Sequence, residues 1–290
     1  MNVPAYLFVW LLIRFFAILP MRVAYLFADF IFVLLYYFPA YRKKIVFKNL
    51  TNAFPEKSKA ERQDIARKFY RYLADQIVES AKTFSMSPEQ IKKRVFITNH
   101  ELYQSYLASN QDLILISSHY ANWELCSAGF SLQVPFTLVG VYLPQKNKRV
   151  DQLIKKCRER SGMWMESAKT ISRNIEKILF HPNMIGLISD QHPANRRSGH
   201  WMKFLNQDTY ITTGPEGFAK RTGRPVLFAE AEKLRRGYYS ITLHVIEDHP
   251  AVSPKYSITE KHVQLLEKII LKKPELWLWS HNRWKHKRAT

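Results

Sequence analysis

The sequence contains few cysteines. Cys126 and Cys157 are the only two in 290 residues, and they fall in different predicted elements. Two isolated cysteines provide neither a disulfide framework nor the paired spacing of a cysteine zinc site. The ten histidines lack H-E-x-x-H or comparable ligand spacing, so no metal is expected. A reducing, cytosol-facing environment fits this cysteine usage best.

Acidic residues are also scarce. There are 24 Asp and Glu against 44 Lys and Arg, a formal charge of +20, and such a field favours polyanionic partners. A disordered basic tail is excluded, because 47% of the residues are hydrophobic and only nine are glycine. No recognised nucleic-acid-binding motif is present, so no nucleic-acid partner is expected. The charge is also compatible with a protein that binds membranes and has no enzymatic activity, and this interpretation stays open as an alternative to an enzyme.

A long charge-free apolar run is missing as well. The segment from Val3 to Tyr41 is almost wholly apolar, but Arg14, Arg22 and Asp29 interrupt it. A bilayer core needs about 20 apolar residues in one helix, which no charge-free run reaches. Three interpretations remain open: one short or tilted span, helices lying in the membrane interface, or a soluble helical hairpin packed on the core.

A basic cluster follows this apolar segment directly. Arg42, Lys43 and Lys44 place the rest of the chain in the cytoplasm by the positive-inside rule. We therefore expect a hydrophobic membrane anchor over residues 1–41 and the catalytic domain over residues 42–290.

Beyond the anchor, the pattern of apolar residues predicts an α/β fold. Helical periodicity dominates residues 45–84, where Ser58 and Glu61 form a capping box. Short apolar runs then alternate with amphipathic stretches around 150–160 and 171–180. Buried strands are expected over 112–118, 136–143, 184–190, 224–232 and 238–246. This alternation predicts a central, mostly parallel sheet flanked by helices.

The stretch LILISSHYANWEL carries the main candidate site. It reads as a buried strand that ends before His119, followed by a helix that Asn122 would cap and that places Glu124 in its first turn. Ligands bind beyond the carboxyl ends of strands in open α/β sheets, and another predicted strand ends at Asp190 and Gln191.

A carboxylate beside one imidazole nitrogen fixes the tautomer, so that the other nitrogen can accept a proton. The sequence has no G-x-S-x-G elbow, so the nucleophile is expected to be a hydroxyl of the substrate. Two structural explanations stay open: His119 and Glu124 as a structural pair, and Asp190 as a cap of the next helix.

Four stretches resemble one enzyme family. HYANWE resembles the H-x4-D/E motif of membrane-associated acyltransferases, and specifically the form found in the bacterial lipid A biosynthesis acyltransferases. RKKIVFKNLTNAFPEKSKAER, LISDQ and ELWLWSHNRWKHK resemble further segments of that family. The resemblance runs in order from Arg42 to Lys287.

The resemblance implies transfer of a fatty acyl group from acyl carrier protein to a hydroxyl of a lipid A precursor at the cytoplasmic face of the bacterial inner membrane. His119 would be the general base and Glu124 its orienting partner, with no cofactor required. An arginine of the family's site would be Arg160, preferred over Arg158. Further oxyanion- or substrate-binding candidates are Asn122, Asp190 and Gln191. A lysophospholipid or an aminolipid is the alternative acceptor.

Basic residues gather in the second half of the chain. They would either attract lipid phosphates and the acidic carrier protein or form ordinary solvated surface. They are Arg196, Arg197, Lys203, Arg221, Arg224, Arg235 and Arg236. Thr212 to Pro215 predict a helix start, since proline suits the first helical turn.

Overall fold

The computed structural model describes residues 3–38, 41–175, 178, 180–193 and 199–288. Its centre is a seven-stranded sheet with strand order β1-β9-β8-β2-β5-β3-β4. The strands are β1 (Val95–Ile97), β2 (Leu113–Ser117), β3 (Thr137–Tyr142), β4 (Trp164–Ser167), β5 (Asn183–Ile188), β8 (Val226–Arg235) and β9 (Tyr238–Glu247). All neighbours pair in parallel except the β8–β9 hairpin. The predicted fold class, a mostly parallel sheet flanked by helices, is confirmed.

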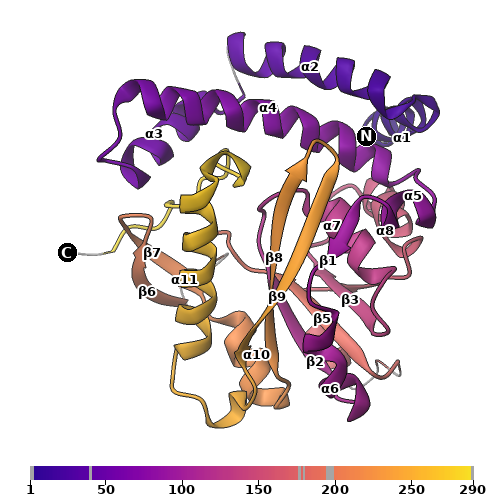
Figure 1. Ribbon diagram of the computed structural model, residues 1–290, viewed down its shortest axis with the longest axis vertical. Helices are drawn as coiled ribbons and strands as arrows, with labels where there is room; N and C mark the ends of the chain where they lie inside the picture. The colour runs from indigo at the N-terminus through magenta and orange to yellow at the C-terminus, as the bar shows by residue number, and fades with distance from the viewer. Residues whose placement is uncertain (1–2, 39–40, 176–177, 179, 194–198, 289–290) are drawn as a thin grey trace.

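Helices cover the sheet and one long helix crosses its end. Figure 1 shows α4 lying across the tip of the β8–β9 hairpin, with α2 outside it and α11 beside the sheet. The helices of five residues or more are α1 (Val3–Ile18), α2 (Met21–Tyr37), α3 (Lys43–Ala53), α4 (Lys59–Thr83), α5 (Pro88–Lys92), α6 (Gln104–Ala108), α7 (Trp123–Ser131), α8 (Lys148–Glu159), α10 (Gly214–Thr222) and α11 (Ser257–Lys272). A small antiparallel pair, β6 (Gly199–Phe204) and β7 (Gln207–Thr212), lies apart from the main sheet.

All five predicted strands are present, and the predicted capping box holds the start of α4. The Ser58 hydroxyl accepts a hydrogen bond from the Glu61 amide, and the Glu61 carboxylate accepts one from the Ser58 amide. Pro215 stands in the first turn of α10, as predicted. Strands β1, β4, β6 and β7 were not predicted, because three to six residues at an edge or in a hairpin give little periodicity. Helix α9 (Ile171–Asn174) is shorter than the predicted helical stretch.

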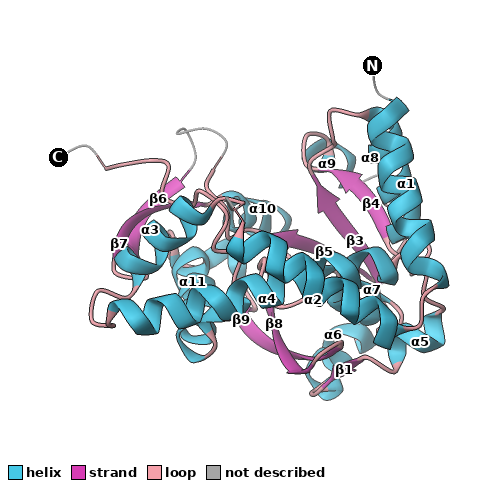
Figure 2. Cartoon of the chain, turned by 90° about the horizontal axis from the view of Figure 1, so that it is seen from above, coloured by secondary structure: helices cyan, strands magenta, loops and turns pink. Residues whose placement is uncertain are grey.

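The apolar N-terminus forms two helices that pack on α4. Ala24 and Ala28 of α2 are fully buried and lie in one small core with Val78 and Ala81 of α4. Side chains of alanine allow the two helix axes to approach closely. Figure 2 shows α1 and α2 on the outer side of the molecule, with α1 leading away from α4.

The opposite faces of α1 and α2 expose many large apolar side chains. Phe8 is 67% exposed, Ile18 80%, Leu26 66% and Phe30 60%. Within the described ranges, neither these helices nor any other is long and apolar enough to cross a membrane. Membrane attachment through this segment remains a prediction.

Asp29, the acidic residue inside the apolar segment, faces the protein. The Asp29 carboxylate pairs with Arg236 at 2.6 Å and with Arg71 at 3.3 Å, and Arg236 also pairs with the buried Asp75. Asp29 therefore joins the N-terminal helices to the turn between β8 and β9 and to α4.

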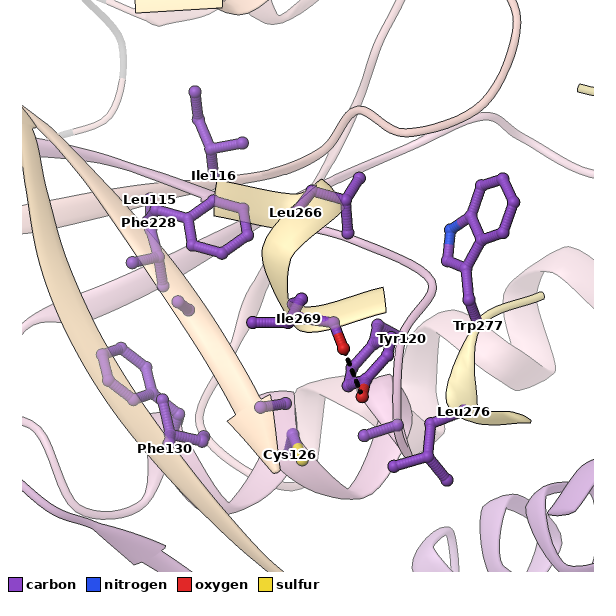
Figure 3. Close-up of a cluster of buried hydrophobic side chains, with 14 of the residues drawn as sticks. Leu115, Ile116, Tyr120, Cys126, Phe130, Phe228, Leu266, Ile269, Leu276 and Trp277 are labelled. Carbon is purple, nitrogen blue, oxygen red and sulfur yellow. Dashed lines mark hydrogen bonds between the residues drawn. The ribbon is translucent and has the colours of Figure 1, made fainter. Parts of the chain in front are cut away.

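The core beneath the candidate site is formed by β2, β8, α7 and α11. Figure 3 shows Leu115, Phe228 and Leu266 packed together, with Tyr120 directing its hydroxyl toward the carbonyl of Ile269, 3.1 Å away. The third residue after β2, Tyr120, thus ties this segment to α11.

Candidate active site

His119 and Asp190 meet because β2 and β5 are neighbouring parallel strands. Ser117 lies opposite Ile188, and the Ser189 amide continues the ladder with a 3.2 Å bond to the Ser117 carbonyl. The residues that follow the two strands consequently emerge at the same edge of the sheet.

The Asp190 carboxylate holds His119 at two points. One oxygen lies 2.7 Å from His119 Nδ1, and the other accepts the His119 amide at 2.9 Å. The second oxygen also accepts the indole N–H of Trp277 at 2.9 Å. Burial acts to raise the pKa of Asp190, but the charge of His119 and these hydrogen bonds outweigh it and lower the pKa. Asp190 is therefore an ionised carboxylate.

An ionised carboxylate only accepts hydrogen bonds, so Nδ1 of His119 carries the proton in this pair. In the neutral imidazole with this tautomer, the other nitrogen, Nε2, carries the lone pair, and the amide nitrogen of Gln191 lies 3.3 Å from it. The Trp123 ring packs edge-on against the imidazole, with centroids 5.0 Å apart. The His119 side chain as a whole is 20% exposed.

Asn122 caps α7 as predicted. Its side-chain oxygen accepts the Leu125 amide at 3.0 Å, and Glu124 lies in the first helical turn. Asn122 is itself fully buried. It therefore acts on the site through the backbone of the loop.

Glu124 does not serve as the hydrogen-bond partner of His119. Its carboxylate accepts one bond from Nε of Arg158, at 3.1 Å, and a second from Nη2 of the same guanidinium. Burial acts to lower the pKa of Arg158, but the bonds and charge of Glu124 raise it. The orienting carboxylate in this structure is Asp190, because the helical turn at α7 directs Glu124 toward α8.

Of the two candidate arginines, only Arg158 contacts another candidate residue. The exposed Arg160 donates to the carbonyl of Phe84 at 2.9 Å, on the opposite side of the turn after α8. Arg160 nevertheless lines the same pocket as Glu124 and Arg158, so the choice between the two arginines stays a prediction.

A small, partly open apolar pocket of about 40 Å³ lies beside the Glu124–Arg158 pair. It lies between α5, α7 and α8. Its apolar lining includes Phe84, Met86, Ile91, Leu132 and Met163.

A second, smaller cavity lies behind Asp190. It has a volume of about 10 Å³, and Ser189, His262 and Arg283 are among its lining residues. Burial lowers the pKa of Arg283 to about 10, while the charge of Asp190 acts in the opposite direction. The sequence did not identify Arg283 or Trp277 as site residues, although both lie in the C-terminal stretch that carried the resemblance.

Two more histidines lie next to the site. His192 and His281 stack with centroids 4.9 Å apart, and their ring nitrogens are 2.9 Å apart. Across the residues that the structure describes, no three His, Cys, Asp or Glu side chains form a group suited to a metal ion.

Several of the predicted basic residues form internal ion pairs. Arg224 pairs with Asp112 at 2.8 Å, and Arg236 pairs with Asp29 and Asp75. Arg196 and Arg197 lie outside the described residues.

The fold and site thus define an α/β protein with a histidine–carboxylate pair at the carboxyl edge of its sheet. The chain belongs to the bacterial lipid A biosynthesis acyltransferase family, whose model matches residues 1–286. The family resemblance of the four sequence stretches is confirmed.

Individual relatives are similar over most of their length. The chain is 27% identical over 249 residues to the lipid A biosynthesis acyltransferase of Haemophilus influenzae, covering 84% of this chain and 78% of that protein. It is 26% identical over 245 residues to the lipid A biosynthesis lauroyltransferase of Escherichia coli, covering 84% and 79%. The lipid A biosynthesis palmitoleoyltransferase of Escherichia coli is 22% identical over 246 residues, with the same coverage.

Proposed function

We propose that this protein transfers a fatty acyl group from acyl carrier protein to a hydroxyl of a lipid A precursor, with His119 as general base. The observation that carries the proposal is the His119–Asp190 pair, in which a buried carboxylate fixes Nδ1–H and leaves the lone pair on Nε2. Family membership supports the acceptor class, a lipid A precursor. The carrier-protein donor is part of the proposal.

The reaction follows from this geometry. The acceptor hydroxyl displaces Gln191 from Nε2 and gives its proton to the imidazole while its oxygen attacks the thioester carbonyl. Asp190 stabilises the imidazolium that forms. The tetrahedral intermediate then expels the thiolate, which takes the proton from Nε2. The new ester and the free carrier thiol leave His119 in its starting state.

Charge on the carbonyl oxygen of the intermediate requires stabilisation. The positive end of α7 begins four residues after His119, and the Arg158 guanidinium lies beside the same helix. Arg158 is neutralised by Glu124, so its field at the site depends on how that pair is oriented.

The apolar pocket beside Glu124 and Arg158 is the proposed location of the acyl chain, and it would have to widen to hold one. Its lining is mostly apolar and also includes the charged residues Glu124, Arg158 and Arg160. An acyl chain in this pocket would place its carbonyl end near α7.

The N-terminal helices are proposed to rest on the inner membrane with the catalytic domain on the cytoplasmic side. Their exposed apolar faces far exceed what a water-exposed helix usually presents. Asp29 and Arg236 pair on the inner face of α2, so the exposed face is free of this charge.

The test is product analysis by mass spectrometry with detergent-solubilised protein. Acyl carrier protein thioesters of several chain lengths are combined with a tetra-acylated lipid A precursor, a lysophospholipid or an aminolipid. We expect acylation of the lipid A precursor only, and its loss by about 10³-fold in His119→Ala, because general-base catalysis contributes about 10²–10⁴-fold.

A matched control is available in His244→Ala. His244 also pairs with a carboxylate, Glu230, at 2.8 Å, but it lies on β9 away from the site. It should retain activity within about twofold. Transfer to another acceptor would overturn the proposed substrate, and the absence of transfer in every combination would overturn the enzymatic proposal.

A further inference from the structure

Helix α4 carries a polar stripe on a buried face. Tyr72, Gln76 and Glu79 are spaced by four and three residues, so they lie on one side of the helix. They are 2%, 4% and 0% exposed. Because burying polar groups is costly unless they form hydrogen bonds, the partners of this stripe are informative.

The partners lie in the loop that carries His119. The Tyr72 hydroxyl donates to the Ala121 carbonyl, and Gln76 Nε2 donates to Asn122 Oδ1 at 3.3 Å. Asn122 Nδ2 in turn donates to a Glu79 carboxylate oxygen at 2.7 Å. The stripe therefore holds two consecutive loop residues from one side.

This loop is held in a conformation that it would not adopt unaided. Ala121 has φ of 51°, in the left-handed region, which costs a residue other than glycine about 1–2 kcal/mol. The strain falls between His119 and the cap residue Asn122, so contacts outside the loop must maintain it.

Glu79 receives hydrogen bonds from three separate elements. Besides Asn122, it accepts from the Tyr239 hydroxyl of β9 at 2.7 Å and from the Tyr25 hydroxyl of α2 at 2.9 Å. Its carboxylate connects the loop to the sheet and to the N-terminal helices.

We propose that Glu79 is a positioning residue that, through Asn122, fixes the loop so that His119 meets Asp190 in the reactive geometry. The proposal rests on the proposed function in one respect only, the role of His119 as the base. This role differs from a purely structural one, in which Glu79 would only attach α4 to the sheet.

The Glu79–Asn122 hydrogen bond can be tested by exchanging the carboxylate and the amide of the two residues. Asn122→Asp keeps a helix-capping side chain but turns a carboxylate toward Glu79. Glu79→Gln removes one charge while keeping the shape. In the double variant Glu79→Gln/Asn122→Asp, the amide of residue 79 donates to the carboxylate of residue 122, which restores the bond in reverse.

We expect Asn122→Asp to lower kcat about 100-fold with KM changed less than about threefold, because a 1 Å displacement of a catalytic group costs about that much. Glu79→Gln alone should lose less than about fivefold, since its amide can rotate to present oxygen to Asn122. The double variant should regain at least about tenfold in kcat over Asn122→Asp.

Asp75→Asn is the matched control for an acid-to-amide change on α4. Asp75 is buried and bonds to Lys233 and Arg236, and neither partner lies in the loop. It should lower the melting temperature without changing kcat.

A second measurement does not depend on activity. Hydrogen–deuterium exchange is followed at residues 119–125, where the amides of His119, Ala121 and Leu125 are hydrogen-bonded. Exchange should accelerate in Asn122→Asp and return toward the wild-type rate in the double variant.

The outcomes separate this proposal from the proposed function. Recovery of both kcat and slow exchange in the double variant supports positioning by Glu79. Slow exchange without recovery of kcat overturns it, as does unchanged exchange in Asn122→Asp. If the wild-type protein transfers no acyl group, the proposed function fails, and the exchange result alone decides whether Glu79 fixes the loop.

Discussion

Two carboxylates flank the His119 loop, and their surroundings differ sharply. Asp190 is buried and accepts two hydrogen bonds from His119 and one from Trp277. Glu124 lines the apolar pocket and is neutralised by Arg158. Asp190 can thus set the state of the imidazole, whereas Glu124 can set only the position of an arginine and the start of α7. Glu124 is close to His119 in the sequence, whereas Asp190 is the carboxylate that contacts His119 in the structure.

The largest expected effect is that of Asp190→Asn. The amide can present its nitrogen to Nδ1 and favour the wrong tautomer, so kcat should fall about 10³- to 10⁴-fold. Steady-state acyl transfer measures the loss. Asp112→Asn, which changes an acid paired with Arg224 instead, should leave kcat unchanged. Near-wild-type kcat in Asp190→Asn would remove Asp190 from the mechanism.

Glu124→Gln should reduce kcat less, by about 10- to 100-fold. The change releases Arg158 from its charge partner and weakens the dipole interaction at α7, without touching the His119–Asp190 bond. A loss equal to that of Asp190→Asn would show instead that Glu124 contacts His119 during the reaction.

The buried His262, which lines the small pocket behind Asp190, should make the free energy of unfolding depend on pH. Burial lowers the pKa of His262 to about 4, below its ordinary value of 6.5, so the unfolded chain binds the extra proton between these values. Stability is full above pH 6.5 and falls toward pH 4, by about 2 kcal/mol between pH 6.5 and pH 5. Urea unfolding across this range measures the slope.

His262→Gln should remove this part of the slope, while the matched His244→Gln should leave it in place. An equal slope in both variants would mean that groups other than His262 cause the pH dependence.

The smallest effect is expected for Arg160→Ala. Its guanidinium is exposed and bonds to the Phe84 carbonyl, so kcat should change less than about threefold although Arg160 lines the pocket. Arg158→Ala, by contrast, leaves Glu124 without its cation and should resemble Glu124→Gln. A larger loss in Arg160→Ala than in Arg158→Ala would reverse the assignment of the two arginines.

Much of the architecture was predictable from local pattern. Buried parallel strands such as β2 and β5 are continuous apolar runs, and caps such as Ser58 and Asn122 act within three residues of their partners. The short edge strands β1 and β4 were missed because they bury too few residues to produce a period.

Part of the membership of the candidate site was predictable, but its pairing was not. His119, Asp190 and Gln191 were recognisable as residues that follow buried strands. His119 and Asp190 meet because β2 and β5 are neighbours in the sheet, and the residues of neither strand predict that strand order. Trp277 reaches Asp190 from the C-terminal segment, and no spacing rule connects the two.

The sequence by itself determined the α/β class, the family and the position of His119 after a buried strand. Periodicity, caps and short motifs are properties of neighbouring residues. The tertiary structure decided that Asp190 holds the imidazole, that Arg158 pairs with Glu124, and that Glu79 joins three elements behind the loop. These contacts link residues 34 to 160 positions apart. Only the packing of strands and helices brings such residues within hydrogen-bonding distance.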